Sequence, residues 1–321
     1  MSFAERRKER AKEKQLQKLE EQQCEWNKIK KPTNVLFNII LSVLSPLCVI
    51  PFIFVIIISF TDEQSLTMNG YRFIPEKWSL YAYEYIVSAG QNILKSYGVT
   101  ILVTVVGTLL GLLLIGTYAY ALSRKTYAFR SFFTKVITVP MLFSGGMIAN
   151  YLVMTKVLML KNSVWALILP LCMNSFNVIV LRTFFKTSIP DAVVESAKID
   201  GASEWKLFFK IVIPMAMPGL ATIGLFLTLG YWNDWFNALM YIDDKSWVPL
   251  QFLMIQIQNS IDWLASNKSM MGVEGIQAAA NLPKETIKMA IVVISTLPII
   301  FAYPFFQRYF VNGLTVGAVK E

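Results

Sequence analysis

The segment Glu195–Pro214, ESAKIDGASEWKLFFKIVIP, is a charged stretch between two of the most apolar parts of the chain. Small side chains come first, at Ser196 and Ala197, and a glycine follows at Gly201. Glycine reaches left-handed backbone angles without a steric penalty, so it can hold a sharp turn between helices. The segment therefore predicts a short helix, a tight turn at Gly201, and a second helix that leads into an apolar span.

The ends of this helical hairpin are predicted from its flanking residues. Ser188 precedes Asp191 by three residues and Pro190 suits a first helical turn, so a capping-box-like start is expected there. The second helix is expected from about Ser203 and carries Trp205. These residues alone are equally compatible with an amphipathic hairpin whose aromatic side chains rest among lipid headgroups.

The composition of the whole chain is that of a membrane protein. Of 321 residues, 55% are hydrophobic and 16% charged, and the mean hydropathy is +0.49. Six apolar segments are each long enough to cross about 30 Å of hydrocarbon as a helix. They are residues 35–60, 97–122, 133–157, 163–185, 211–236 and 287–310. The sequence predicts an all-α integral membrane protein with six transmembrane helices, in which a membrane domain, 32–321, follows a charged extension, 1–31.

Glycines and prolines affect the expected shape and packing of these spans. Prolines recur inside or at the ends of the spans, and each removes a backbone donor, so kinked helices are expected. Gly107 and Gly111 form a GxxxG pair in the second span. Such a pair permits close packing of a neighbouring helix, either within the chain or in another subunit.

Charges are distributed as the positive-inside rule requires for cytoplasmic termini. Ten basic residues lie between Arg6 and Lys31, and further basic residues follow the second and fourth spans. The loops 61–96 and 241–286 carry more acid than base. We therefore expect the net charge of +9 to face the cytoplasmic surface of a lipid bilayer, not nucleic acid. The predicted location is a bacterial plasma membrane, crossed several times, with both termini in the cytoplasm.

The content of reactive residues argues against catalysis by this chain. It has no histidine, and its three cysteines show no paired spacing, so a metal site or a cysteine–histidine nucleophile is not expected. No GxxxxGK[ST] loop is present to hold nucleotide phosphates. The chain is predicted to be a transport subunit and not an enzyme.

The hairpin resembles the EAA signature of binding-protein-dependent ABC importer permeases. The resemblance is carried by its position before the penultimate span and by Glu195-Ser196-Ala197, Asp200-Gly201-Ala202, Phe208, Pro214 and Pro218. Ser196 stands where the family usually has a second alanine, a small residue for a small one. The resemblance implies the type I ABC importer permease fold, with 188–210 as a cytoplasmic coupling segment that docks on an ATPase. The coupling residues it implies are Glu195, Ser196, Ala197, Asp200, Gly201, Ala202 and Phe208.

Other stretches are similar to the carbohydrate branch of that family. The ending QRYFVNGLTVGAVKE resembles the C-terminal tail of maltose-type permeases. YGVTI at 97–101, MLFSGGMIANYLV at 141–153 and YWNDWFNALMYI at 231–242 resemble a Gram-positive group associated with oligosaccharide uptake, although Ala149 stands where that group carries proline. By this resemblance the tail, 311–321, reaches between the paired ATPases. Its implied contacts are Asn312, Gly313, Thr315 and Gly317.

The resemblance also implies the partners and the source of energy. They are a second transmembrane permease, usually a different chain, a dimer of cytoplasmic ATPases, and an extracellular sugar-binding lipoprotein. ATP and Mg²⁺ would be bound by the ATPase, and this chain is expected to bind no cofactor itself.

Polar residues inside the spans are candidates for a substrate path. Sugars are bound through hydrogen bonds to hydroxyls and through flat aromatic contacts. Residues of both kinds occur in the fourth and fifth spans, at Asn174, Asn177, Trp232, Asn233, Asp234 and Asn237. The structural alternative is that amides join neighbouring helices and that tryptophan belongs to the interfacial belt. A carboxylate at the end of a span, as at Asp234, must be solvated or paired.

Three functional classes are compatible with a helical membrane protein of this kind. The first is a permease subunit that passes an oligosaccharide, or another solute, from a binding protein to the cytoplasm by alternating access. The second is an ion-coupled secondary transporter, which needs ionisable relays near the midplane and usually an internal repeat. The third is a membrane scaffold without a coupling segment. The EAA-like hairpin favours the importer.

Overall fold

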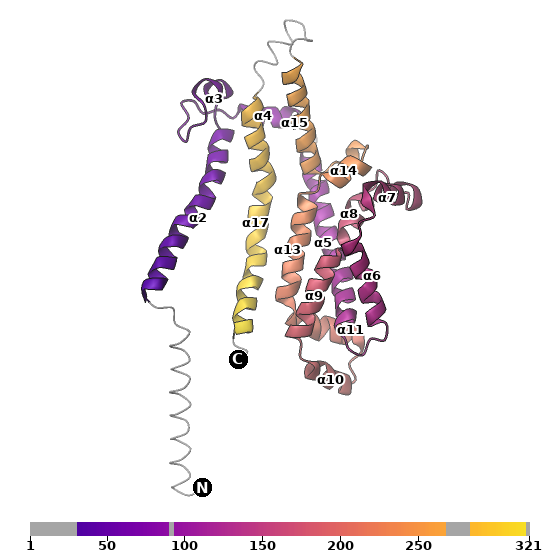
Figure 1. Ribbon diagram of the computed structural model, residues 1–321. Helices are drawn as coiled ribbons and strands as arrows, with labels where there is room; N and C mark the ends of the chain where they lie inside the picture. Colours follow the sequence, from indigo (N-terminus) through magenta and orange to yellow (C-terminus); the bar gives the residue numbers. More distant parts are fainter. Residues whose placement is uncertain (1–30, 90–92, 268–282, 319–321) are drawn as a thin grey trace. The chain divides into compact units, whose positions relative to one another are not determined.

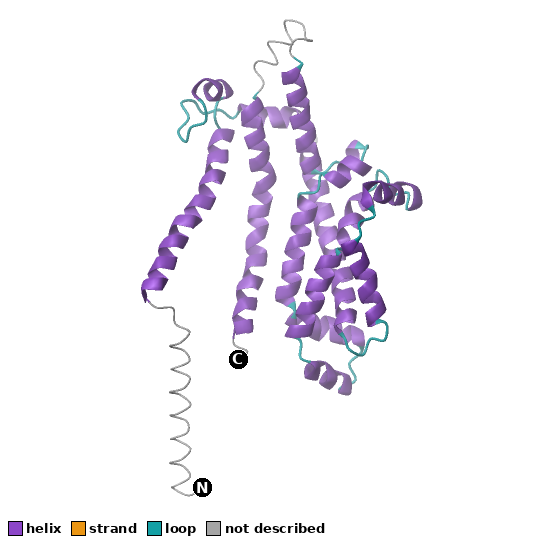
Figure 2. Cartoon of the chain, viewed as in Figure 1, coloured by secondary structure: helices purple, strands orange, loops and turns teal. Residues whose placement is uncertain are grey.

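The computed structural model describes residues 31–89, 93–267 and 283–318, and Figure 2 shows that the described chain is built from helices. Only an isolated bridge between Thr61 and Trp78 has β character in this part of the chain. The expected all-α class is confirmed. The predicted extension, 1–31, lies outside the described residues except for Lys31, and the chain divides into two compact units, Met1–Val55 and Ile56–Glu321.

The helices follow one another closely along the chain (Figure 1). The longer ones are α2 (Lys31–Ser59), α5 (Ile93–Ser123), α6 (Arg130–Leu142), α9 (Ser175–Ser188), α13 (Met217–Trp232), α15 (Leu250–Ser266) and α17 (Lys284–Ala318). The shorter ones are α3 (Glu63–Asn69), α4 (Tyr81–Ala89), α7 (Gly146–Leu152), α8 (Val164–Cys172), α10 (Asp191–Ile199), α11 (Glu204–Leu207), α12 (Ile213–Met215) and α14 (Phe236–Tyr241). Two π-helical turns, η1 (Val153–Val157) and η2 (Phe208–Val212), and a 3-10 turn, η3 (Lys245–Trp247), complete the described set.

Three helices, in α2, α5 and α17, are long and apolar enough to cross a membrane unbroken. Three bent pairs raise the number of possible spans to six. The segments predicted at 133–157, 163–185 and 211–236 are therefore each broken, with bends of 118°, 49° and 84°. The last bend falls at Ala216, between Pro214 and Pro218, because Pro218 lies in the first turn of α13, where a missing N–H costs no helical hydrogen bond.

The second predicted span, α5, packs against α13, α9 and α8 in the larger unit. A side chain at Gly107 would collide with the Tyr231 ring of α13, and one at Gly111 would come within 2.9 Å of the Cys172 carbonyl oxygen and of the Leu227 side chain. The GxxxG pair therefore serves packing within the chain. Large buried side chains on these helices, including Ile115 and Phe185, form the main hydrophobic core.

The first turn of α17 is fixed by a carboxylate from α3. Glu63 accepts hydrogen bonds from the backbone N–H groups of Glu285 at 3.0 Å and Thr286 at 2.9 Å, and from the Thr286 hydroxyl at 2.7 Å. Backbone donors in the first turn of a helix have no partner inside the helix, and a negative charge there also complements the helix dipole. Glu63 thus connects the start of α3 to the start of α17.

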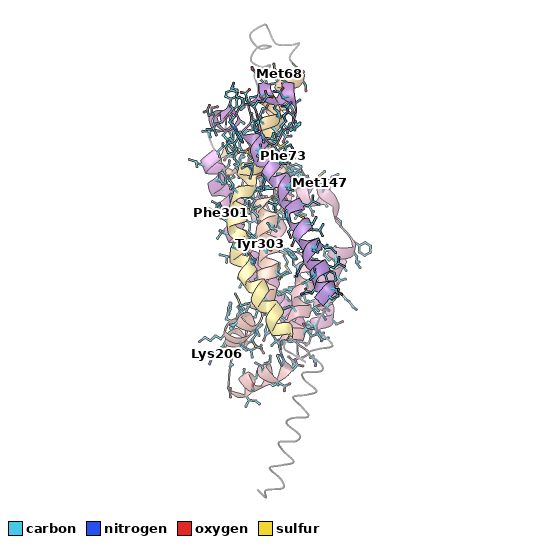
Figure 3. All side chains as sticks on the ribbon, turned by 90° about the vertical axis from the view of Figure 1, so that its left-hand side faces the viewer. Met68, Phe73, Met147, Lys206, Phe301 and Tyr303 are labelled. Carbon is cyan, nitrogen blue, oxygen red and sulfur yellow. The ribbon has the colours of Figure 1, made fainter. Side chains whose placement is uncertain are left out.

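The two ends of the larger unit carry different elements. α10 and α11 lie at one end of the helices, and α7 and α14 lie toward the other (Figure 1). Figure 3 likewise places Lys206, in α11, at the end opposite Met68, in α3. The charged hairpin and the loops expected to face outward are therefore separated by the length of the spanning helices.

Candidate coupling hairpin and solute path

The hairpin turn at Gly201 is a Schellman motif. Gly201 has a φ of +75°, its N–H donates to the Lys198 carbonyl at 3.0 Å, and the N–H of Ala202 donates to the Ala197 carbonyl at 3.0 Å. These two bonds satisfy carbonyls that the end of α10 would otherwise leave free. Ser203 then caps α11, because its hydroxyl accepts from the N–H of Lys206 at 3.3 Å. The left-handed turn expected from the sequence is present.

The start of the hairpin differs from the prediction. Ser188 is the last residue of α9, and α10 begins at Asp191 after Pro190 without a side-chain cap. Pro190 is held in an extended conformation and has no side-chain acceptor, so the capping-box prediction was wrong. Asp191 instead pairs with Lys125, 2.9 Å away, and this hydrogen-bonded ammonium lowers the pKa of the Asp191 carboxyl.

Polar contacts join the two helices of the hairpin to each other and to the end of α5. Glu204 binds Lys198 at 2.6 Å across the turn and accepts a hydrogen bond from the Tyr120 hydroxyl at 3.0 Å. The Arg124 guanidinium lies over the Tyr120 ring, 5.0 Å from its centroid. The contact between Tyr120 and Glu204 was not predicted from the sequence, because the two residues are 84 positions apart along the chain.

The predicted coupling residues divide into an exposed and a buried set. Glu195, Ser196 and Asp200 are exposed. Ala197 is buried, and Phe208 is only 3% exposed, so these two side chains face the protein interior and cannot form an outer docking surface. Gly201 is exposed as well, and Ala202 is half-buried. Exposed apolar side chains lie beside this set, at Ile199, which is 86% exposed, and at Trp205, which is 67% exposed and stacks on the exposed ring of Phe209. Ile199 was not predicted, although an isolated apolar residue in a polar helix was a usable signal.

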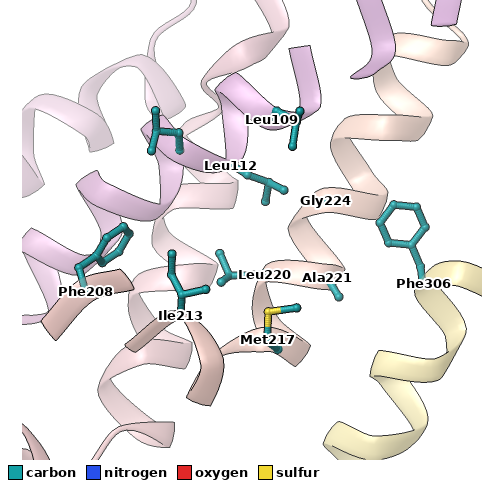
Figure 4. A pocket seen from close by; sticks show the side chains of 10 residues that line it. Leu109, Leu112, Phe208, Ile213, Met217, Leu220, Ala221, Gly224 and Phe306 are labelled. Carbon is teal, nitrogen blue, oxygen red and sulfur yellow. The ribbon is translucent and has the colours of Figure 1, made fainter. Parts of the chain in front are cut away.

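Phe208 connects the hairpin to the spanning helices. Its ring packs against Tyr120, with centroids 5.2 Å apart, and it lines an apolar pocket of about 340 Å³ (Figure 4). The pocket lies between α5, the bent segment before α13, and α17, and its wall includes Leu112, Met217 and Phe306. A movement of the hairpin would therefore reach α5 and α13 through this buried ring.

The predicted tail contacts lie beyond the last described side chain. Asn312, Gly313, Thr315 and Gly317 are within α17, whose backbone remains helical to Ala318, but their side chains lie outside the described ones. The tail thus continues the last spanning helix.

Two of the predicted path residues cap helices. The Asn174 side chain accepts from the N–H of Phe176 at 2.8 Å, which caps α9 at the break after α8. Asn233 ends α13 and donates through Nδ2 to the Leu229 carbonyl at 2.9 Å. Asn177 is 8% exposed and lies in the next turn of α9. Asn174 thus caps its own helix, whereas Asn233 also accepts from Gln251 Nε2 of α15 at 3.4 Å and so joins a neighbouring helix, as the structural alternative holds.

Trp232 supports α17 where a proline interrupts its hydrogen bonds. Pro298 has no N–H, so the Ile294 carbonyl lacks its helical donor, and the Tyr97 hydroxyl of α5 donates to it at 2.7 Å. Trp232 Nε1 donates to the next carbonyl, that of Ser295, at 2.9 Å. Trp232 is buried, so the structure places this predicted path residue against a neighbouring helix.

Asp234 and Asn237 form a close pair at the break between α13 and α14. Asp234 Oδ2 accepts from Asn237 Nδ2 at 2.9 Å, and Oδ1 accepts from the Asn237 backbone N–H at 3.2 Å. Asn237 also lines a pocket of about 250 Å³ formed by α7, η1, α8 and α14. Asn150, on α7, lines the same pocket and was missed by sequence reasoning, although it is polar within an apolar segment.

Comparisons with known proteins show which family this chain resembles. Residues 104–316 match the model of the binding-protein-dependent transport system inner membrane component. The polygalacturonan/rhamnogalacturonan transport system permease protein of Bacillus subtilis is 42% identical over 274 residues, which cover 85% of this chain and 93% of the relative. Protein LplC of the same organism is 40% identical over 287 residues, covering 89% and 93% of the two chains.

A solved structure agrees with the sequence relatives. A chain in the crystal structure of a bacterial ABC transporter involved in the import of the acidic polysaccharide alginate is similar, with a TM-score of 0.72 and 29% sequence identity. The similarity covers 88% of this chain and 100% of the other. The expected ABC importer permease fold is thereby confirmed. The chain belongs to the family of binding-protein-dependent transport system inner membrane components and is a permease subunit of an ABC importer.

Proposed function

We propose that this chain is one of two permease subunits that carry an oligosaccharide into the cytoplasm of a bacterium. The names of its relatives support a saccharide substrate, since they include a polygalacturonan/rhamnogalacturonan permease and an arabinooligosaccharide permease that is 28% identical over 282 residues. The family argues against the ion-coupled alternative, because its transport systems depend on a binding protein. A non-sugar solute remains a distinct outcome of the experiment below.

The observation that carries this proposal is the rigid hairpin with an exposed outer face. Its turn is closed by two backbone hydrogen bonds, and its helices are tied to Tyr120 and Lys125. Glu195, Ile199 and Trp205 offer one carboxylate and two apolar side chains to a partner. A charge-assisted bond flanked by apolar contact suits docking on a cytoplasmic ATPase.

The remaining subunits would complete the transport cycle. Two ATPases bind ATP and Mg²⁺, close on each other, and pull on the hairpins of this chain and of a second, different permease. The closed ATPase pair must bind ATP more tightly than the open pair, because a ligand shifts a conformational equilibrium only through differential affinity. The cavity then opens outward to receive sugar from an extracellular lipoprotein.

The proposed orientation places the hairpin and both termini in the cytoplasm. The basic residues between Arg6 and Lys31 and those beside the hairpin support this orientation. The tail contacts at Asn312, Gly313, Thr315 and Gly317 would then lie on the side of the ATPases. No nucleic acid is involved, since the basic charge faces anionic lipid.

Reconstitution of the complete complex tests the proposal. This chain would be coexpressed with the second permease, the ATPase and the binding protein of its transport system, and the complex would be inserted into liposomes. Binding protein loaded with a pectin-derived oligosaccharide should stimulate ATP hydrolysis and drive uptake of labelled sugar. If only a non-sugar solute stimulates ATP hydrolysis, the substrate is not an oligosaccharide. Uptake that continues without the ATPase would overturn the ATP-driven mechanism.

A further inference from the structure

The 250 Å³ pocket is surrounded by irregular backbone. η1 is a π-helical turn, α7 follows a bend of 118°, and α14 follows the break at Asn233–Trp235. Within a membrane, backbone that leaves the regular helix persists only where protein buries it or where it lines a polar cavity. Broken helices of this kind form the substrate sites of many transporters, and π-helical turns are frequent at functional sites.

Two amides with unused hydrogen-bonding capacity line this pocket from different segments. Asn237 gives Nδ2 and its backbone N–H to Asp234, which leaves its Oδ1 and its second Nδ2 hydrogen available. Among the described residues, no hydrogen bond is made by the Asn150 side chain or by Asn237 Oδ1. Together the two amides offer donors and acceptors to one small ligand.

The rest of the wall is mostly apolar, and three of its side chains are flexible methionines. Phe236 and Met147 are partly exposed, and the wall beside the amides also includes Met240, Met154, Val153, Pro170 and the ring of Tyr241. A sugar ring presents hydroxyls at its edge and C–H groups on its faces, so it needs both kinds of surface. The volume is below the roughly 300–1,000 Å³ of pockets for drug-sized ligands, so a single ring of a longer chain matches it.

The local charge selects among sugar rings. None of the residues that line the pocket in the described part of the chain is charged. Lys156 lies on η1 but is exposed and does not line the pocket, whereas Asp234 accepts a hydrogen bond from the lining residue Asn237. A carboxylate beside the pocket repels an anionic ring and leaves a neutral, hydroxylated ring unaffected.

We propose that the pocket between α7–η1 and α14 is a subsite for one uncharged sugar ring of the transported oligosaccharide. Asn150 and Asn237 bind its hydroxyls. Asp234 is a positioning residue that holds the Asn237 amide in one orientation, with Oδ1 turned away from the carboxylate. This inference rests on the proposed function and adds to it a place and a charge preference for the sugar.

The test uses uptake by the reconstituted complex. Two probes are compared: rhamnogalacturonan oligosaccharides, in which neutral rhamnose alternates with galacturonate, and oligogalacturonides, in which every ring is charged. Asn237→Leu and Asn150→Leu should each raise KM for the first probe about five- to tenfold, as expected for a lost hydrogen bond to a neutral group, with kcat nearly unchanged. Asp234→Asn should raise KM about threefold or more, because it replaces one of the two oxygens that accept from Asn237 with an NH₂ donor and so loses one of the two hydrogen bonds that orient the amide. Asn267→Leu, an equivalent change at an amide that caps the end of α15 outside the pocket, should leave KM unchanged.

A second measurement does not depend on transport kinetics. In a complex whose Cys24, Cys48 and Cys172 are replaced, Met147→Cys places a thiol in the pocket wall. The rhamnogalacturonan probe should slow its reaction with a water-soluble methanethiosulfonate at least threefold, and oligogalacturonides should not. If a leucine variant accumulates poorly, this protection decides the matter.

The outcomes separate the two proposals. Uptake by the wild-type complex with an unchanged KM in both leucine variants, or with no protection of the thiol, overturns the subsite and leaves the importer standing. Equal dependence of both probes on Asn237 overturns the preference for an uncharged ring. Absence of any oligosaccharide uptake by the wild-type complex overturns both proposals.

Discussion

Replacing Gly201 with valine tests whether the hairpin turn transmits force. Gly201 has a φ of +75°, and a Cβ atom there would meet no atom within 4 Å in the described chain. The cost within this subunit is therefore the strain of a left-handed backbone alone, about 1–2 kcal/mol. At about 1.4 kcal/mol for each factor of ten, the equilibrium constant between the native turn and other backbone conformations falls roughly 5- to 30-fold.

Gly70 provides a matched control for this substitution. It has a φ of +73°, no atom within 4 Å of an added Cβ, and a position at the C-terminal cap of α3. Gly70→Val should carry a backbone cost at least as large at the opposite end of the larger unit, because the ψ of Gly70, −174°, combined with its positive φ, lies in a region that is essentially restricted to glycine. We expect Gly201→Val to reduce both copurification of the ATPase and sugar uptake by at least fivefold at normal membrane abundance. Gly70→Val should retain the ATPase.

Two results would refute this reasoning. Equal loss of ATPase binding in both variants would mean that backbone strain merely destabilises the subunit. Wild-type binding and uptake in Gly201→Val would mean that the hairpin rests on the lipid surface, as the interfacial alternative holds.

Three further predictions follow from single contacts. Glu195→Ala should weaken ATPase copurification, by about 2–5 kcal/mol if the carboxylate is fully desolvated in the complex, while membrane abundance stays normal; unchanged copurification would remove Glu195 from the interface. Gly107→Leu should lower the abundance and thermal stability of the subunit, because its side chain would displace the Tyr231 ring; a stable variant would mean that α5 and α13 separate easily. Tyr97→Phe should lower the melting temperature in detergent, since the Ile294 carbonyl, four residues before Pro298, loses its donor at a cost of about 1–3 kcal/mol, and an unchanged melting temperature would show that another donor replaces it.

Features that depend on neighbouring residues could be predicted from the sequence. The hydropathy of the segments in α2, α5 and α17 identified unbroken helices, because about 20 apolar residues determine a span by themselves. The turn at Gly201 was predictable for the same reason, since the left-handed conformation excludes most other residues at that one position. The family could be recognised because the hairpin signature is local and stands in a defined place before a span.

Features that depend on distant partners were decided by the tertiary structure. Trp232 and Asn237 belong to the same polar and aromatic stretch, yet one side chain donates to a carbonyl of α17 beside Pro298 and the other lines a pocket with Asn150. Phe208 lies in the docking signature, but packing against Tyr120 turns it inward and leaves Ile199 on the surface. The sequence determined which segments are apolar and where the backbone must turn. The roles of the polar and aromatic side chains depended on which helix lies opposite each one, and that pairing exists only after the chain has folded.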